Sequence, residues 1–153
     1  MRENSIRIGA KQGVPIVREM ITDVAVCTEL GESCPWLYRK ERRDNISAKN
    51  LEKYNRAIVG IADKLAEVHI EFSEDRQAVL DQISECLKSV KLKYIYEKHL
   101  GHDTEWWTYR TRRLNDKGYG YSLTEEEVLK INLGVADIVA RLRRIELVTD
   151  DAD

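Results

Sequence analysis

Two stretches of the chain share one pattern, in which apolar side chains recur at intervals of three and four residues. The apolar positions of the first stretch are Leu51, Tyr54, Ile58, Ile61, Leu65 and Val68, and those of the second are Val128, Ile131, Val135, Ile138 and Leu142. This spacing places the apolar side chains along one face of an α-helix. Ser47 precedes the first stretch, and Thr124 with Glu127 forms a capping box before the second. The pattern therefore predicts two long amphipathic helices.

The segments before these helices also match one another. The Leu-Gly pair at 30–31 aligns with the pair at 100–101, and the string Trp-x-Tyr-Arg at 36–39 aligns with the same string at 107–110 if the second segment has one extra residue. Motifs and apolar spacing that recur in the same order indicate an internal repeat. Two helical hairpins with convergent patterning are the alternative.

The repeat predicts an all-α fold of two tandem helix-turn-helix-like repeats, residues 12–72 and 73–148, each ending in a longer amphipathic helix. The two copies should pack together, because units of ~70 residues bury little surface alone. A short helix is expected to carry Pro15 in its first turn. A second helix is expected to start at Asp23 as its N-cap and to stop at Gly31, where glycine permits the left-handed conformation.

A hydroxyl residue stands near the start of the next helix in each copy, Ser33 in the first and Thr104 in the second. Such a side chain can accept hydrogen bonds from the free N–H groups of the helix start. Helix starts of this kind also meet phosphate groups in complexes with nucleic acid. Both hydroxyls are therefore candidates for the N-cap and for phosphate contact.

Positive charge is concentrated in two short segments. Residues 36–43 hold four basic side chains against one glutamate, and residues 106–117 hold four against one aspartate, so each segment carries +3. Because the whole chain carries −2, the remainder carries −8. The total excludes a global attraction to nucleic acid or membrane, whereas phosphate contact needs only local Lys and Arg. The alternative is that these side chains pair with nearby carboxylates on a solvated face.

The order Leu30, Gly31, Ser33, Trp36, Leu37, Tyr38 resembles the helix-turn-helix segment of bacterial and phage regulators. It is also similar to a small uncharacterised family found in gut Bacteroidetes and their mobile elements, whose members carry an (F/L)-G-x-S-x-x-W-L-Y string. The resemblance spans about residues 20–45 and, more weakly, about residues 90–115, which would make this chain a duplicated version of that unit. It implies no known substrate or site. Glu97 stands where a small residue is usual, and Lys40 stands where an apolar one is usual.

The leading hypothesis is a small DNA-binding regulatory protein with basic recognition helices. Its candidate nucleic-acid-binding residues are Ser33, Arg39, Lys40, Arg42, Arg43, Thr104, Arg110, Arg112, Arg113 and Lys117. The alternative is a helical protein–protein adaptor that uses its Trp and Arg residues on a partner protein, since these residue types are favoured at interface hot spots. DNA is the expected partner under the first hypothesis, and a homodimer is allowed under both. Arg clusters on one continuous face would favour DNA, and Arg side chains held in ion pairs would favour the adaptor.

The aromatic residues of the two basic segments have different expected roles. Trp36 and Trp107 occupy aligned positions and are expected in the core, because large aromatics dominate small cores. Trp106 has no counterpart in the first copy, so it is either an exposed contact or an interface anchor.

Catalytic chemistry is not favoured. The sequence has no phosphate-binding glycine loop and no GxSxG nucleophile elbow. His99 and His102 stand near Asp103, but Gly101 interrupts the helix between the histidines and no third ligand is evident. The expectation is a protein that is not an enzyme and that binds no cofactor, no metal and no evident small-molecule substrate.

The expected compartment is the cytoplasm. Three cysteines cannot all pair and show no CxxC spacing, which indicates a reducing environment. The start of the chain is polar, and no apolar run approaches the ~20 residues needed to cross a bilayer, so no membrane association is expected.

Overall fold

The structure, a computed structural model, describes residues 5–31, 46–112 and 121–150. Within these ranges the fold is mostly helical, as the sequence predicts, with one short pair of strands. The elements in chain order are β1 (Ile6–Gly9), α1 (Ala10–Met20), α2 (Asp23–Leu30), α5 (Ala48–Ala66), α6 (Arg76–Cys86), α7 (Leu92–Lys98), α8 (Thr104–Thr111), α9 (Glu125–Arg144) and β2 (Ile145–Val148).

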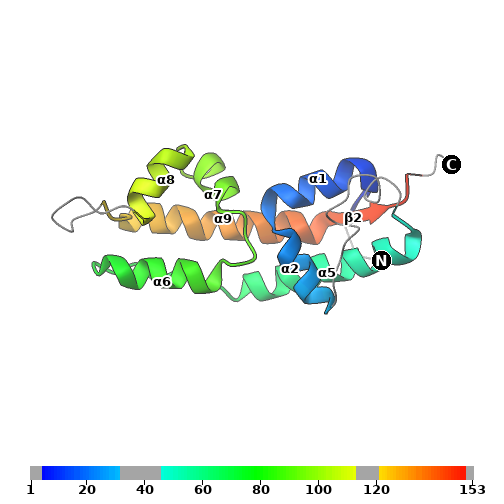
Figure 1. The fold of residues 1–153 in the computed structure, drawn as a ribbon, viewed down its shortest axis with the longest axis horizontal. Helices are drawn as coiled ribbons and strands as arrows, with labels where there is room; N and C mark the ends of the chain where they lie inside the picture. Colours follow the sequence, from blue (N-terminus) through cyan, green and yellow to red (C-terminus); the bar gives the residue numbers. More distant parts are fainter. Residues whose placement is uncertain (1–4, 32–45, 113–120, 151–153) are drawn as a thin grey trace.

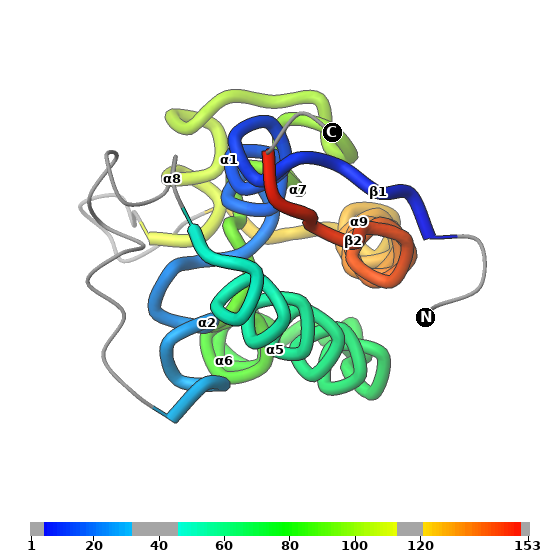
Figure 2. Tube along the Cα trace, turned by 90° about the vertical axis from the view of Figure 1, so that its right-hand side faces the viewer, coloured from blue at the N-terminus to red at the C-terminus, as the bar shows by residue number. Residues whose placement is uncertain are grey.

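The helices form three layers, with α9 in the middle. Helices α1, α7 and α8 lie on one side of α9, and α2, α5 and α6 lie on the other (Figure 1). The view along the long axis shows the same separation (Figure 2). Because α9 has neighbours on both sides, it is the central element of the described core.

The two long helices α5 and α9 pack against each other and run in opposite directions (Figure 1). Their starts are those predicted: the Ser47 side chain accepts from the Asn50 N–H, and Thr124 and Glu127 form a capping box. The apolar pairs that the sequence alignment places together are all buried, namely Leu51 and Val128, Ile58 and Val135, and Leu65 and Leu142. Burial of these stripes is the main source of stability for both helices.

The first helix differs from the prediction. It begins at Ala10, so Pro15 lies inside it rather than in its first turn. Proline removes the hydrogen bond to the carbonyl of Lys11. Both residues are exposed, so water can solvate that carbonyl. The opposite face of α1 is buried, and this burial keeps the segment helical on both sides of the proline.

The second helix has a different cap from the one expected. The side chain of Thr22, not of Asp23, accepts from the Ala25 N–H at 3.0 Å. Asp23 instead forms an ion pair with Arg18 of α1, with 2.9 Å between Arg18 Nε and Asp23 Oδ1. The predicted stop is confirmed, because Gly31 has φ 71°, in the left-handed region that glycine favours.

One contact joins the two turns that follow α1 and α6. Residues Ile21 and Val90 form an antiparallel bridge. The Thr22 N–H donates to the Ser89 carbonyl at 3.0 Å, and the Lys91 N–H donates to the Met20 carbonyl at 2.9 Å. The α1–α2 turn of the first half of the chain is thereby fixed to the α6–α7 turn of the second half.

Strands β1 and β2 were not predicted. They pair in parallel, from Ile6 opposite Ile145 to Gly9 opposite Val148. Each has four residues, too few to show a strand pattern in the sequence. Gly13 of α1 lies against β2, where a Cβ would collide with the Leu147 side chain. The strands therefore join segments from near the two ends of the chain.

Two asparagine side chains each hold a strip of extended backbone. Asn55 of α5 donates to the Leu147 carbonyl and accepts from the Leu147 N–H, both at 2.9 Å. Asn132 of α9 donates to the Ile70 carbonyl at 2.9 Å and accepts from the Ile70 N–H at 2.8 Å. Leu147 and Ile70 are both buried. We call these two contacts the asparagine clamps; each satisfies a buried peptide that has no ladder partner on that side.

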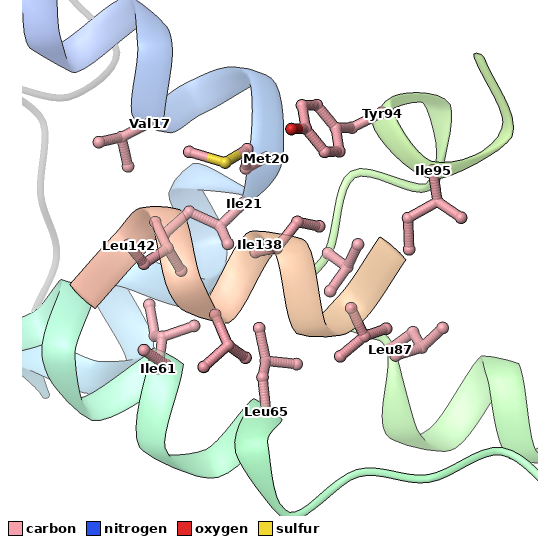
Figure 3. Close-up of a cluster of buried hydrophobic side chains, with 14 of the residues drawn as sticks. Val17, Met20, Ile21, Ile61, Leu65, Leu87, Tyr94, Ile95, Ile138 and Leu142 are labelled. Atoms are coloured by element: carbon pink, nitrogen blue, oxygen red, sulfur yellow. The ribbon is translucent and has the colours of Figure 1, made fainter. Parts of the chain in front are cut away.

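A single apolar core connects the two halves of the chain. Figure 3 shows side chains of α1, α5, α7 and α9 meeting in it, among them Val17, Ile61, Ile95 and Ile138. No described polar or charged residue is fully buried. The layered arrangement is thus stabilised mainly by apolar contact.

Candidate functional site

The structure describes three of the ten candidate nucleic-acid-binding residues. Thr104 and Arg110 lie on α8, and Arg112 follows directly after it. The other seven lie outside the described residues: Ser33, Arg39, Lys40, Arg42, Arg43, Arg113 and Lys117. Trp36 and Cys34 also lie outside them.

Thr104 does not cap α8, so that prediction is wrong. The cap is Asp103, whose Oδ1 accepts from the Trp106 N–H at 3.0 Å. The Thr104 hydroxyl instead shares a hydrogen bond of 2.7 Å with the Tyr96 hydroxyl on α7. The carboxylate next to Thr104 satisfies the free N–H groups of the helix start and places a negative charge there. A phosphate group would meet that charge at the start of α8.

Arg110 is held within the protein. Its Nη1 donates to the Ser122 carbonyl at 2.9 Å and to Glu127 Oε1 at 3.3 Å. Its guanidinium lies 4.9 Å from the Trp106 ring centre and 5.6 Å from that of Tyr121. Glu127 also closes the capping box of α9. Arg110 therefore ties α8 to the start of α9, and its charge is already balanced, whereas Arg112 is exposed.

The two tryptophans of α8 have the different roles that the sequence suggested. Trp107 is buried and stacks on Tyr96, with ring centres 5.4 Å apart. Trp106 is only partly buried and stacks on His102 at 4.0 Å with nearly parallel planes. The core assignment of Trp107 is confirmed, and Trp106 lies at the surface edge of that core.

Trp106, Tyr109, Arg110 and Tyr121 surround a shallow hollow of about 350 Å³. Tyr109 and Tyr121 meet edge to face with ring centres 6.4 Å apart, and they are 38% and 64% exposed. We call these four residues the aromatic cluster. It combines a positive guanidinium, three ring faces and little net charge, because Glu127 neutralises Arg110.

Besides the aromatic cluster, the structure contains a polar group around Asp137 that sequence reasoning missed. Asp137 of α9 accepts from the Tyr94 hydroxyl at 2.8 Å and from Arg141 Nε at 3.0 Å, and its Oδ2 lies 3.0 Å from His99 Nε2. These residues lie beside a groove of about 510 Å³ between β1, α1, α7 and α9, which Tyr94, Asp137 and Arg141 help to line.

This environment shifts the ionisation of Asp137 and Tyr94. Burial opposes the charged form of Asp137, but the hydrogen bonds from Tyr94, His99 and Arg141 outweigh it and hold the pKa of Asp137 below its usual range. Burial and the hydrogen bond to Asp137 raise the pKa of Tyr94 to about 12. Asp137 is thus a charged acceptor and Tyr94 a neutral donor at neutral pH.

Only a local sign of this group is visible in the sequence. Asp137 and Arg141 are four residues apart on one helix, a spacing that permits an ion pair. The approach of Tyr94 and His99 from α7 depends on tertiary packing. His99 and His102, considered together as metal ligands, face different partners, Asp137 and Trp106. No three His, Cys, Asp or Glu side chains gather as a metal site within the described ranges.

Comparison with known proteins gives no match for this chain among family models, curated proteins or solved structures. Among the described helices, none combines the length and the apolar composition needed to span a bilayer.

Proposed function

We propose that the chain acts by binding rather than by catalysis, and that it recognises a partner protein through the aromatic cluster on α8. The observation that carries this proposal is the state of Arg110, whose guanidinium is paired with Glu127 and covered by Trp106 and Tyr121. Because a carboxylate already balances this guanidinium, a phosphate gains less from it than from an unpaired arginine.

The composition of the cluster supports a protein partner. Tyr, Trp and Arg are the residue types most enriched at hot spots of protein interfaces. The half-exposed rings of Trp106 and Tyr109 surround a hollow that an apolar side chain of a partner can enter. The paired guanidinium needs no new counterion there, so burying it in an interface costs less than burying a lone charge.

The proposal includes two tandem helix-turn-helix-like repeats as the scaffold. The asparagine clamps support it: Asn55 and Asn132 occupy aligned positions on α5 and α9, and each holds the extended segment that follows the other long helix. The bridge between the α1–α2 and α6–α7 turns is a second reciprocal contact. Two copies of one unit related by a local two-fold axis would produce both contacts.

Crosslinking in the cell that makes the protein tests this function. A photo-reactive residue in place of Tyr121 should trap one partner, which is then identified and titrated against purified variants. Tyr109→Ala should weaken that complex at least tenfold, because truncating a hot spot costs about 2 kcal/mol or more. Val24→Ala is the control, since Val24 is an exposed apolar residue that lies on α2, away from the aromatic cluster. Equal affinity of the Tyr109→Ala variant and the parent would reject the aromatic cluster as the binding surface.

DNA binding is the second candidate. It is favoured by the α7–α8 pair, which is joined through Gly101 at φ 73° and followed by the exposed Arg112. Anisotropy titration of mixed genomic DNA at ~50 mM salt tests it, because non-specific binding is visible under those conditions. If Arg112 contacts a phosphate, Arg112→Ala should reduce the slope of log affinity against log salt by about 0.9. A parent protein that binds no DNA at this salt concentration would remove the second candidate.

A further inference from the structure

Helix α9 carries a second apolar stripe on the side opposite its buried one. Leu129 and Leu133 are 57% and 56% exposed, and Ala136 and Ala140 are exposed on the same face. Their intervals of four, three and four residues align them along the helix. In Figure 2, α9 lies at the right-hand edge of the molecule rather than between other helices in that direction. Leu129 and Leu133 lie one turn apart and form a contiguous exposed apolar patch, the kind of surface that marks an interaction site.

The ends of this stripe carry opposite charges. Glu125 and Glu126 lie at its beginning, and Arg143 and Arg144 lie at its end, all four exposed. The groove of about 510 Å³ brings Ile6 of β1 beside Ala140 and Arg144. Ile6 is itself 55% exposed, so it continues the apolar surface past the end of the stripe.

We propose that a second copy of this chain docks on the stripe, with the two α9 helices antiparallel. The order of residues along the stripe indicates that the partner is a second copy. When a second α9 is reversed about a point midway between Gly134 and Val135, complementary residues lie opposite each other. In that register Leu129 faces Ala140 of the second copy, and Leu133 faces its Ala136. Each large side chain meets a small one, and both halves of the contact are the same, as a two-fold interface requires.

The charges follow the same reversal. In the antiparallel register Glu125 and Glu126 lie at the level of Arg143 and Arg144 of the second copy. Parallel helices would place like charges together at both ends. Arg143 already pairs with Asp63 of its own chain at 3.0 Å, so Glu125 and Arg144 form the pair that a charge exchange can test.

Other occupants fit the stripe less well. A lipid surface favours basic residues along an apolar face, whereas this stripe begins with two glutamates. The aligned positions of α5 are Glu52, Arg56, Val59 and Asp63, so an apolar stripe is not a general property of the helical unit. A standard interface buries about 800 Å² per partner. The exposed Ile6 side chain would add apolar area to the contact between the two α9 helices.

Sedimentation equilibrium of the full chain over a concentration series tests the second copy. The parent should show a monomer–dimer equilibrium, and Leu129→Glu with Leu133→Glu should give a monomer at every concentration. Val24→Glu is the control for the kind of substitution, because it also places a glutamate at an exposed apolar residue, a valine that is 64% exposed on α2. It should leave the dimer unchanged. Circular dichroism confirms that each variant stays helical. A monomeric parent, or a dimer that the double variant retains, would overturn the proposal.

Charge exchange tests the direction of the helices. Glu125→Arg alone and Arg144→Glu alone should each weaken the dimer about tenfold, because both ends change from attraction to repulsion. An equimolar mixture of the two variants should form a heterodimer of near-parental affinity, which native mass spectrometry separates from the homodimers by mass. A mixture with no preference for the heterodimer would overturn the antiparallel register.

Discussion

The joint where α2 meets α5 and the joint where α7 meets α9 are held by different polar chemistry. At the first, Lys64 Nζ lies 2.7 Å from Glu29 Oε2, with the lysine side chain 75% exposed. At the second, Asp137 is shared by Tyr94, His99 and Arg141 at the edge of the core. The polar contact at the first joint is a single ion pair with an exposed lysine, and that at the second is a small network in which one carboxylate serves three partners.

A glycine makes room at each joint. A Cβ at Gly60 would collide with the Glu29 carboxylate, and a Cβ at Gly134 would lie 3.2 Å from the His99 ring. The asparagine clamps, by contrast, have the same geometry in both halves. The comparison indicates that the clamps and apolar stripes define the architecture, while the joints are free to differ.

Breaking the clamps should have the largest effect on stability. Asn55→Ala and Asn132→Ala each leave a buried N–H and C=O without their partner, so each should lower the free energy of unfolding by about 2 to 4 kcal/mol. Similar losses are expected because the two clamps have the same geometry. Urea unfolding measures both values. Asn50→Ala is the control on α5, where only the backbone N–H of Asn50 takes part in the cap, and it should change stability by less than about 0.5 kcal/mol. A large loss at one clamp and none at the other would break the equivalence.

Removing the acceptor carboxylate should lower the free energy of unfolding by different amounts at the two joints. Asp137→Ala leaves Tyr94 and His99 without their partner at the core edge and should cost about 1 to 2 kcal/mol. Glu29→Ala removes a single ion pair, whose lysine is 75% exposed and whose carboxylate is 20% exposed, and should cost less than about 1 kcal/mol. Equal losses in urea unfolding would contradict the distinction between a network with several donors and a single pair.

The smallest expected effect is on the pH dependence of the free energy of unfolding. Because the pKa of Asp137 is lowered, its stabilising contribution is present above the unfolded value of about 3.9 and is lost as the pH falls through its folded pKa. Asp137→Asn should therefore flatten the acid side of the stability profile. The raised pKa of Tyr94 acts in the opposite direction, since its contribution is present below about 10 and is lost as the pH rises through about 12.

An ultraviolet titration of tyrosinate isolates the second effect. The parent should contain one tyrosine that ionises near pH 12, and Tyr94→Phe should remove that step. Asp137→Ala should move the step to lower pH, because the acceptor and its negative charge are gone. A titration curve that Tyr94→Phe leaves unchanged would contradict the assignment.

Much of the fold follows from local pattern. The apolar stripes located α5 and α9, Ser47 and Thr124 located their starts, and Gly31 located the end of α2. These features depend on residues within one or two helical turns of each other. The start of α1 was misjudged at Pro15, because its buried face is completed by contact with β2, which no local signal shows.

The candidate site was less accessible to sequence reasoning. The spacing of Arg110 marked it as a surface cation, but Glu127 lies 17 residues away and neutralises it through the fold. Thr104 was assigned a capping role that the adjacent Asp103 performs. Asp103 stands two residues after Gly101, as Ser33 stands two residues after Gly31, so the extra residue of the second segment lies after the cap and not before it. The clamps join residues 62 and 92 positions apart, so asparagine alone carries no sign of them.

The parallel pairing of β1 and β2 determines how the protein responds to tension. β1 runs away from the chain start and β2 runs toward the chain end, in the same direction. A pull on residues 5 and 149 in opposite senses therefore slides one strand along the other, so that their hydrogen bonds must break together rather than one by one. The Asn55 clamp on Leu147 lies under the same load. Force applied between residues 5 and 149 therefore loads the paired strands and the Asn55 clamp in shear rather than peeling them apart.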